Sequence, residues 1–280
     1  MEATAISRGQ RERSACTRAR AIIRFNGLLF HGLAAASFLE SAAPLYANRA
    51  MRAFARHPDV GLWLEQVWQP QRAERGRQLR GYIEAMWSEF DWSAAYGEFH
   101  ETCRPRFERA APPPSLALEA LRLCATEVQA AVFYRALANG ADEPVLRELA
   151  QEAALEHAAH FQYFRSVFER CERRERIGLV ATCRTVIECS RTARRRDVAE
   201  AFQPLAQHWY GNQPVPELGY GEFVERMVQL VRRHAALGRF ERWLFRPWLK
   251  REGGAPAAQS TVGETVRWAS PAPQFRAAAA

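Results

Sequence analysis

The sequence has almost no lysine, few strand-like patterns and no long apolar run. Lys250 is the only lysine among 39 basic residues. The most apolar stretch, Gly27–Leu39, is interrupted by His31 and is shorter than the roughly 18–20 residues of a membrane-spanning helix. Alternating Val, Ile and Thr residues, which are typical of strands, are also scarce. These absences argue against a membrane span and a β-rich fold, although the basic residues before Gly27 leave a targeting segment within residues 1–20 open.

Several motifs of common enzyme classes are also missing. The six cysteines include no CxxC pair, and a chain of 280 residues needs no disulfides to fold. We therefore expect reduced thiols and a cytoplasmic protein. The sequence contains no glycine-rich phosphate loop, no dinucleotide fingerprint and no recognisable nucleophile constellation.

The chain is basic, with a formal net charge of +8 and a pI near 9.6. Its arginines are spread along the whole length and alternate with glutamates. The densest group, Arg191–Arg196, has no aromatic residues beside it that could stack on bases. We interpret it as a solvated helix end and predict no nucleic-acid partner.

Apolar residues recur at helical spacing over most of the chain, so the sequence predicts an all-α fold. We expect a flexible segment over residues 1–20, a four-helix core over 21–172, a helical extension packed on it over 173–250, and a disordered tail over 251–280. The predicted helices span Ile22–Arg56 with a kink at Pro44, Asp59–Trp87 with a bend or restart at Pro70, Trp92–Cys103, Ser115–Asn139, Asp142 to beyond Phe168, Arg174–Arg191, Val198–Tyr210 and Gly221–Trp248. A proline-rich linker is expected over Pro105–Pro114, with Asp59 and Asp142 as N-caps.

Two glutamates stand on apolar helix faces. The helical neighbours of Glu127 include Ala120, Cys124, Ala131 and Tyr134, so its side chain is predicted to point into the core. Glu40 is surrounded in the same way by small residues of its own helix. A lone buried carboxylate is costly, and both glutamates are therefore expected to have a charged partner or a metal ion.

Cations and histidines interrupt two further apolar faces. Arg72 and Arg75 fall on a stripe that runs from Leu64 to Met86, unless Pro70 breaks the stripe and the two side chains reach outward to water. His157 and His160 lie on the inward face of the helix after Pro144, with Glu156 on its flank. We expect Glu40, Arg72, Arg75, Glu127, His157 and His160 to form one buried polar cluster.

These residues resemble the ferritin-like superfamily of diiron-carboxylate proteins. The segment Thr126–Leu137 (TEVQAAVFYRAL) is similar to its third-helix carboxylate segment, and Ala154–Phe164 (ALEHAAHFQYF) to its fourth-helix motif. The segment Trp87–Trp92 (WSEFDW) is similar to uncharacterised bacterial proteins of this type. The resemblance implies an up-down four-helix bundle in which two helices each give one Glu and two give Glu-x-x-His, and it suggests a homodimer.

The resemblance carries only part of the metal-ligand set. Glu40 and Glu127 match the single carboxylates, and His157 matches the fourth-helix histidine. The second-helix motif is replaced by Arg72-Ala-Glu-Arg75, and Ala154 stands where the glutamate paired with His157 would be. Our first hypothesis is therefore a degenerate, non-catalytic di-metal site, in which both arginines pair with Glu40 and Glu127 and no cofactor is needed.

Two alternatives remain open. In the first, iron or manganese binds in a site with fewer or rearranged ligands, which gives a diiron-type, O2-activating oxidoreductase or oxygenase. The ligands would come from Glu40, Glu127, Glu156, His157 and His160. The basic aromatic segment at residues 239–251 suits an anionic membrane surface or a protein partner, unless its aromatic residues cap the bundle.

Overall fold

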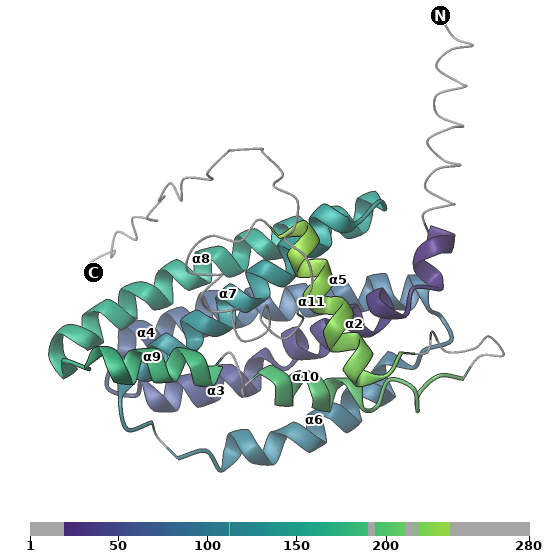
Figure 1. Cartoon of the computed structure of the whole chain (residues 1–280). Coiled ribbons are helices and arrows are strands. Elements are labelled where there is room, and N and C mark those ends of the chain that lie inside the picture. Colours follow the sequence, from purple (N-terminus) through teal and green to yellow (C-terminus); the bar gives the residue numbers. More distant parts are fainter. Residues whose placement is uncertain (1–19, 112, 190–193, 211–215, 217, 236–280) are drawn as a thin grey trace, which may run out of the picture.

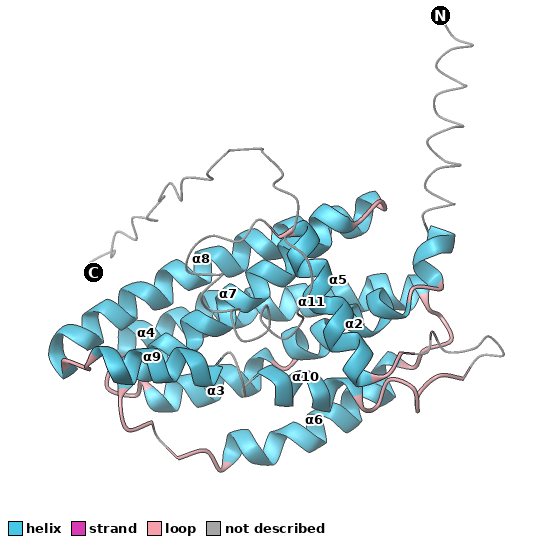
Figure 2. Cartoon of the chain, in the orientation of Figure 1, coloured by secondary structure: helices cyan, strands magenta, loops and turns pink. Residues whose placement is uncertain are grey.

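The computed structural model describes residues 20–111, 113–189, 194–210, 216 and 218–235. Every named element in these ranges is helical, and the β-type pairing found there is an isolated bridge between Phe90 and Trp209 (Figure 2). The predicted all-α fold is confirmed for this part of the chain. The elements are α2 (Gly27–Ser41), α3 (Ala43–Ala53), α4 (Pro58–Trp63), a π-helical turn (Leu64–Trp68), α5 (Gln69–Met86), α6 (Trp92–Glu108), α7 (Leu116–Gly140), α8 (Pro144–Glu175), α9 (Leu179–Glu188), α10 (Arg194–Phe202) and α11 (Tyr220–His234).

The first predicted helix is divided into α2 and α3. The Asn26 side chain caps α2 by accepting a hydrogen bond from the Leu29 N–H, 3.1 Å away. The two helices meet at a 46° bend. The bend falls at Ala42, just before Pro44, which lies in the first turn of α3 where a missing N–H costs no helical bond.

The second predicted helix changes its hydrogen bonding before Pro70. The Gln69 N–H bonds to the Leu64 carbonyl five residues earlier, which gives a π-helical turn. Helix α5 follows without a break, with Pro70 in its first turn. The predicted N-cap at Asp59 is wrong, because Pro58 already lies in the first turn of α4 and His57 precedes it.

The caps of the next two long helices follow from their sequences. The Ser115 hydroxyl accepts from the Leu118 N–H and begins α7 as predicted. The N-cap of α8 is Glu143 rather than Asp142, since its carboxylate accepts from the Leu146 N–H at 2.8 Å. Helix α8 continues through the predicted domain boundary at residue 172 and ends at Glu175.

Two further boundaries differ from the prediction. Helix α6 passes through Pro105 to Glu108, although this proline has no N–H to bond to the carbonyl of Glu101. The helices of the extension are shorter than expected: α9 begins at Leu179, α10 ends at Phe202, and α11 ends at His234. Residues 1–19 and 236–280 lie outside the described residues, so the expected N-terminal segment, the anchor at 239–251 and the tail do too, apart from Arg20.

Four helices surround the buried polar residues. Helix α7 packs along α8, α2 packs along α5, and α5 also contacts α8 (Figure 1). Helix α9 lies against α7, α10 against α2 and α6, and α11 against α7 and α2. The short C-terminal helices therefore cover the outside, and the polar residues of α2, α5, α7 and α8 meet inside. In the described residues no single helix has the length and hydropathy to cross a membrane, and α2 and α3 meet those criteria only as a bent pair.

Gly76 allows the close approach of α5 to α2. A Cβ atom at this position would lie 2.5 Å from Oγ and 2.8 Å from the backbone nitrogen of Ser41. We therefore expect Gly76→Ala to lower the free energy of unfolding by about 1–3 kcal/mol. Gly81→Ala in the same helix meets nothing within 4 Å and should raise it by about 0.5–1 kcal/mol. Urea denaturation of both variants measures the difference, and equal stabilities would contradict this packing.

Candidate metal centre

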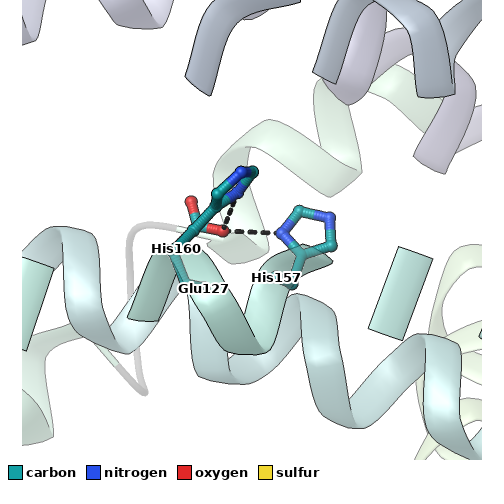
Figure 3. A group of neighbouring side chains, drawn as sticks. All are labelled: Glu127, His157 and His160. Atoms are coloured by element: carbon teal, nitrogen blue, oxygen red, sulfur yellow. Dashed lines mark hydrogen bonds and ion pairs between the residues drawn. The ribbon is translucent and has the colours of Figure 1, made fainter. Parts of the chain in front are cut away.

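The buried cluster is built around Glu127 of α7. Its Oε2 atom lies 2.6 Å from Nδ1 of His157 and 3.3 Å from Nδ1 of His160, both on α8. Figure 3 shows the two imidazoles converging on this one oxygen. The three residues are buried, and their potential ligand atoms lie within 4.8 Å of one another. The i, i+3 spacing on α8 places both imidazoles on the same face of the helix, opposite α7.

The other nitrogen of each imidazole also faces an oxygen. Nε2 of His157 is 3.1 Å from Oε1 of Glu40, and Nε2 of His160 is 2.8 Å from Oε1 of Gln71. A carboxylate can only accept hydrogen bonds, whereas a neutral imidazole has a single N–H. His157 lies between two carboxylates, so it must be protonated unless a cation replaces the hydrogen at Nδ1.

Glu40 of α2 is paired with an arginine. Nε of Arg72 donates to Oε2 of Glu40 at 2.5 Å, and Nη2 donates to the Leu39 carbonyl at 3.3 Å. Arg72 therefore makes a single hydrogen bond to Glu40 and not a bidentate pair. The guanidinium lies 4.8 Å from the ring centre of Trp68 and 5.6 Å from that of Tyr46. Both charged side chains are buried.

The prediction that Arg75 also neutralises the buried glutamates is wrong. The Arg75 side chain lies inside, but it pairs with Glu152 at 3.3 Å and with Glu156 at 2.9 Å. It further donates to Gln78 and to the Leu149 carbonyl. Arg75 follows Arg72 by three residues, so the two side chains leave α5 about 60° apart. Arg75 is directed at Glu152 and Glu156 of α8, whereas Arg72 is directed at Glu40.

Glu156 does not join the candidate ligands, so its place in the alternative metal set is also wrong. Its side chain is 35% exposed and accepts from Arg75. Neighbouring residues on a helix point about 100° apart, so Glu156 and the adjacent His157 face different surroundings. Glu40 bonds to Arg72 and His157 instead of joining the group around Glu127. The structure thus divides the predicted ligands into two parts: a Glu40–Arg72 ion pair, and a group of one carboxylate and two imidazoles.

Burial and charge act in opposite directions on the pKa values of these groups. Burial alone would raise the pKa of Glu40, but the charges of Arg72 and His157 hold it well below the ordinary value of 4.5. Burial likewise opposes ionisation of Glu127, yet the charge and hydrogen bond of His157 keep its pKa low. The pKa of His157 is raised above 6.5 because the two carboxylates outweigh its burial.

These shifts predict a stability maximum for metal-free protein. The lowered pKa values of the glutamates stabilise the fold above pH 4.5, and this contribution is lost as the pH falls toward the folded values. The raised pKa of His157 stabilises the fold below pH 6.5, and this is lost as the pH rises through the folded value. Urea denaturation in a chelator should therefore show highest stability between these limits. Glu127→Gln should flatten the profile, whereas Glu84→Gln on the surface of α5 should leave it unchanged; a flat wild-type profile would contradict the assignment.

Three partners of the cluster were not predicted as such. The indole N–H of Trp68 donates to Oε1 of Glu127 at 3.1 Å, and the Tyr134 hydroxyl donates to Oε1 of Glu40 at 3.3 Å. Their sequence positions indicated the core, but large aromatic residues at helical spacing do not reveal which polar atom they contact. Gln71 stands outside the apolar stripe of its helix, and no sequence pattern distinguishes it from a surface glutamine.

No protein-family model, curated protein or solved structure matches the chain. Its function must therefore be inferred from the site itself. The group around Glu127 contains two imidazoles and one carboxylate, a ligand set that binds ferrous iron with coordination positions left open.

Proposed function

We propose that the protein is a ferritin-like helical bundle whose metal centre holds one ion instead of two. The ligands of this ion are Glu127, His157 and His160. The Glu40–Arg72 ion pair takes the place of a second ion. On this proposal the protein is an iron-dependent, O2-using oxidoreductase. Only the part of the site around Glu40 and Arg72 is then degenerate, because an ion pair stands there in place of a metal ion.

The observation that carries this proposal is the orientation of both imidazoles. Each directs Nδ1 at Oε2 of Glu127, while Nε2 faces Oε1 of Glu40 or Gln71. Histidines that bind metals almost always donate their other ring N–H to a carboxylate, a carbonyl or water. Glu40 and Gln71 are such acceptors, and they would fix the tautomer that presents the Nδ1 lone pair to an ion.

The two arginines donate to groups other than the three candidate ligands. Arg72 donates to Glu40 and Leu39, and Arg75 donates to residues of α5 and α8 outside the cluster. An ion among the three ligands must lie about 2.0–2.2 Å from each donor atom, so binding would lengthen the present 2.6 Å contact between His157 and Glu127.

A ferrous ion bound here would supply one-electron chemistry with O2. The protein residues contribute the surroundings: Arg72 keeps Glu40 ionised, Glu40 and Gln71 orient the imidazoles, and the packed helices exclude bulk water. All three ligands come from the two helices with the most extensive mutual packing, which favours a rigid site.

The test is the reaction of ferrous-loaded protein with O2. Anaerobic protein carrying one equivalent of Fe2+ should oxidise it, with O2 consumption, at least about tenfold faster than the Glu127→Gln variant. Arg75→Met, which changes a neighbouring buried cation outside the ligand group, should behave like the wild type. Stopped-flow absorbance and an oxygen electrode give the rates. Oxidation at the rate of free ferrous ion in every variant would refute the proposal.

A second candidate follows from the charges of the metal-free cluster. Two carboxylates, Glu40 and Glu127, face two cations, Arg72 and protonated His157. This core is neutral without any ion, and a protein of this kind would serve as a non-catalytic scaffold. It is distinguished by metal binding: a scaffold gains no stability from Fe2+, Co2+ or Zn2+.

A further inference from the structure

We propose that Trp68 restricts Glu127 to binding an ion through one oxygen, and thereby keeps a coordination position for a small monoanion. The inference rests on the proposed metal centre and adds to it a ligand class and a positioning residue.

The two oxygens of Glu127 have different partners. Oε2 faces Nδ1 of both imidazoles, whereas Oε1 accepts a hydrogen bond from the indole N–H of Trp68 at 3.1 Å. Glu127 is completely buried, so this hydrogen bond lies in the protein interior. The indole N–H occupies one lone pair of Oε1, so it weakens this oxygen as a metal ligand and favours binding of an ion through Oε2 alone.

The indole is itself held in place. Trp68 ends the π-helical turn, is 1% exposed, and packs edge-on against Phe164 at a ring distance of 6.2 Å. Its other face lies against the guanidinium of Arg72. The N–H is therefore a fixed donor whose direction is set by packing, and it can orient the carboxylate before an ion arrives.

Charge determines which ligand the remaining position would take. Glu40 and Arg72 cancel, and both histidines bind metals only as neutral imidazoles. A divalent ion with the single carboxylate of Glu127 then leaves one positive charge in a buried site. An uncompensated buried charge is costly, so a monoanion small enough to fit between packed helices is favoured over a neutral ligand.

Cobalt(II) and azide provide the test, because tetrahedral and higher-coordinate Co2+ differ in visible absorption. The wild-type protein with one equivalent of Co2+ should bind azide with a change in this spectrum, and neutral acetonitrile should cause none at equal concentration. In Trp68→Phe the freed Oε1 should occupy the position, and azide affinity should fall at least about tenfold while cobalt is retained. Trp63→Phe is the matched control, since Trp63 contacts His160 only through its ring, and it should bind azide normally.

Each outcome is decisive. Unchanged azide affinity in Trp68→Phe, or equal binding of acetonitrile, would overturn the inference and leave the metal centre standing. Failure of the wild type to bind cobalt at all would overturn the metal centre and this inference together. Infrared difference spectra of the wild type upon cobalt binding need no variant: a one-oxygen carboxylate pattern supports the role of Trp68, and a chelating pattern contradicts it.

Discussion

Replacing Arg72 with methionine is expected to lower the free energy of unfolding by about 3–5 kcal/mol. The substitution removes the cation from a buried pair whose Nε–Oε2 distance is 2.5 Å and leaves Glu40 charged in the interior. Most of the loss is the cost of that uncompensated charge and little of it is the strength of the pair. Denaturation in guanidinium chloride, monitored by circular dichroism, measures the change.

Two variants show whether the buried charge is the cause. Glu40→Gln/Arg72→Met removes both charges and keeps an oxygen acceptor for His157, so it should recover much of the loss. Arg75→Met should cost only about 1 kcal/mol, because its partners Glu152 and Glu156 are 52% and 35% exposed and remain hydrated. Equal losses for Arg72→Met and Arg75→Met would contradict the assignment of Arg72 to a buried carboxylate and of Arg75 to exposed ones.

Metal binding is expected to have the second large effect. A ligand present at a hundred times its dissociation constant raises the free energy of unfolding by about 2.7 kcal/mol when only the folded state binds it. Zn2+, which has no redox chemistry, should stabilise the wild-type protein by this amount. His160→Phe removes one of three ligands and should abolish most of the gain, as thermal or urea denaturation with and without Zn2+ will show.

A histidine outside the cluster provides the control for this effect. His208 pairs with Glu98 at 2.9 Å and contacts none of the three candidate ligands. His208→Gln should therefore keep the full stabilisation by Zn2+. If His208→Gln lost as much as His160→Phe, the ion would be binding elsewhere on the surface; if neither variant nor wild type responded, the neutral scaffold would be the better description.

The sequence was sufficient to predict the helices but not all of their ends. Apolar spacing and caps such as Ser115 act locally, so α7 begins where expected. The end of α6 depends on packing that no local pattern records, and Pro105 proved compatible with its last turn. The π-helical turn was also beyond prediction. A single change in hydrogen-bond register before Pro70 costs little locally and is compensated by the tertiary contacts of Trp68.

Most residues of the candidate site could be predicted from the sequence, but the pairs that they form could not. Glu40, Glu127, His157 and His160 interrupt apolar faces, and burial of such groups is expensive enough to require partners. Which groups pair depends on the rotation of each helix and on its distance from the next. Sequence spacing placed Arg72 and Arg75 on one stripe. Their side chains nevertheless leave the helix in directions that differ enough for Arg72 to reach Glu40 and for Arg75 to reach Glu156. No sequence pattern indicated that Gln71 belongs to the site.

We propose that Arg72 neutralises one half of this cluster and that the other half binds one ion. Anaerobic titration of the metal-free protein with Fe2+ tests this most directly, with bound iron counted by mass spectrometry after removal of excess. We expect one iron per chain in the wild type and in Arg75→Met, and none in Glu127→Gln. Two irons per chain, or none in the wild type, would contradict the claim.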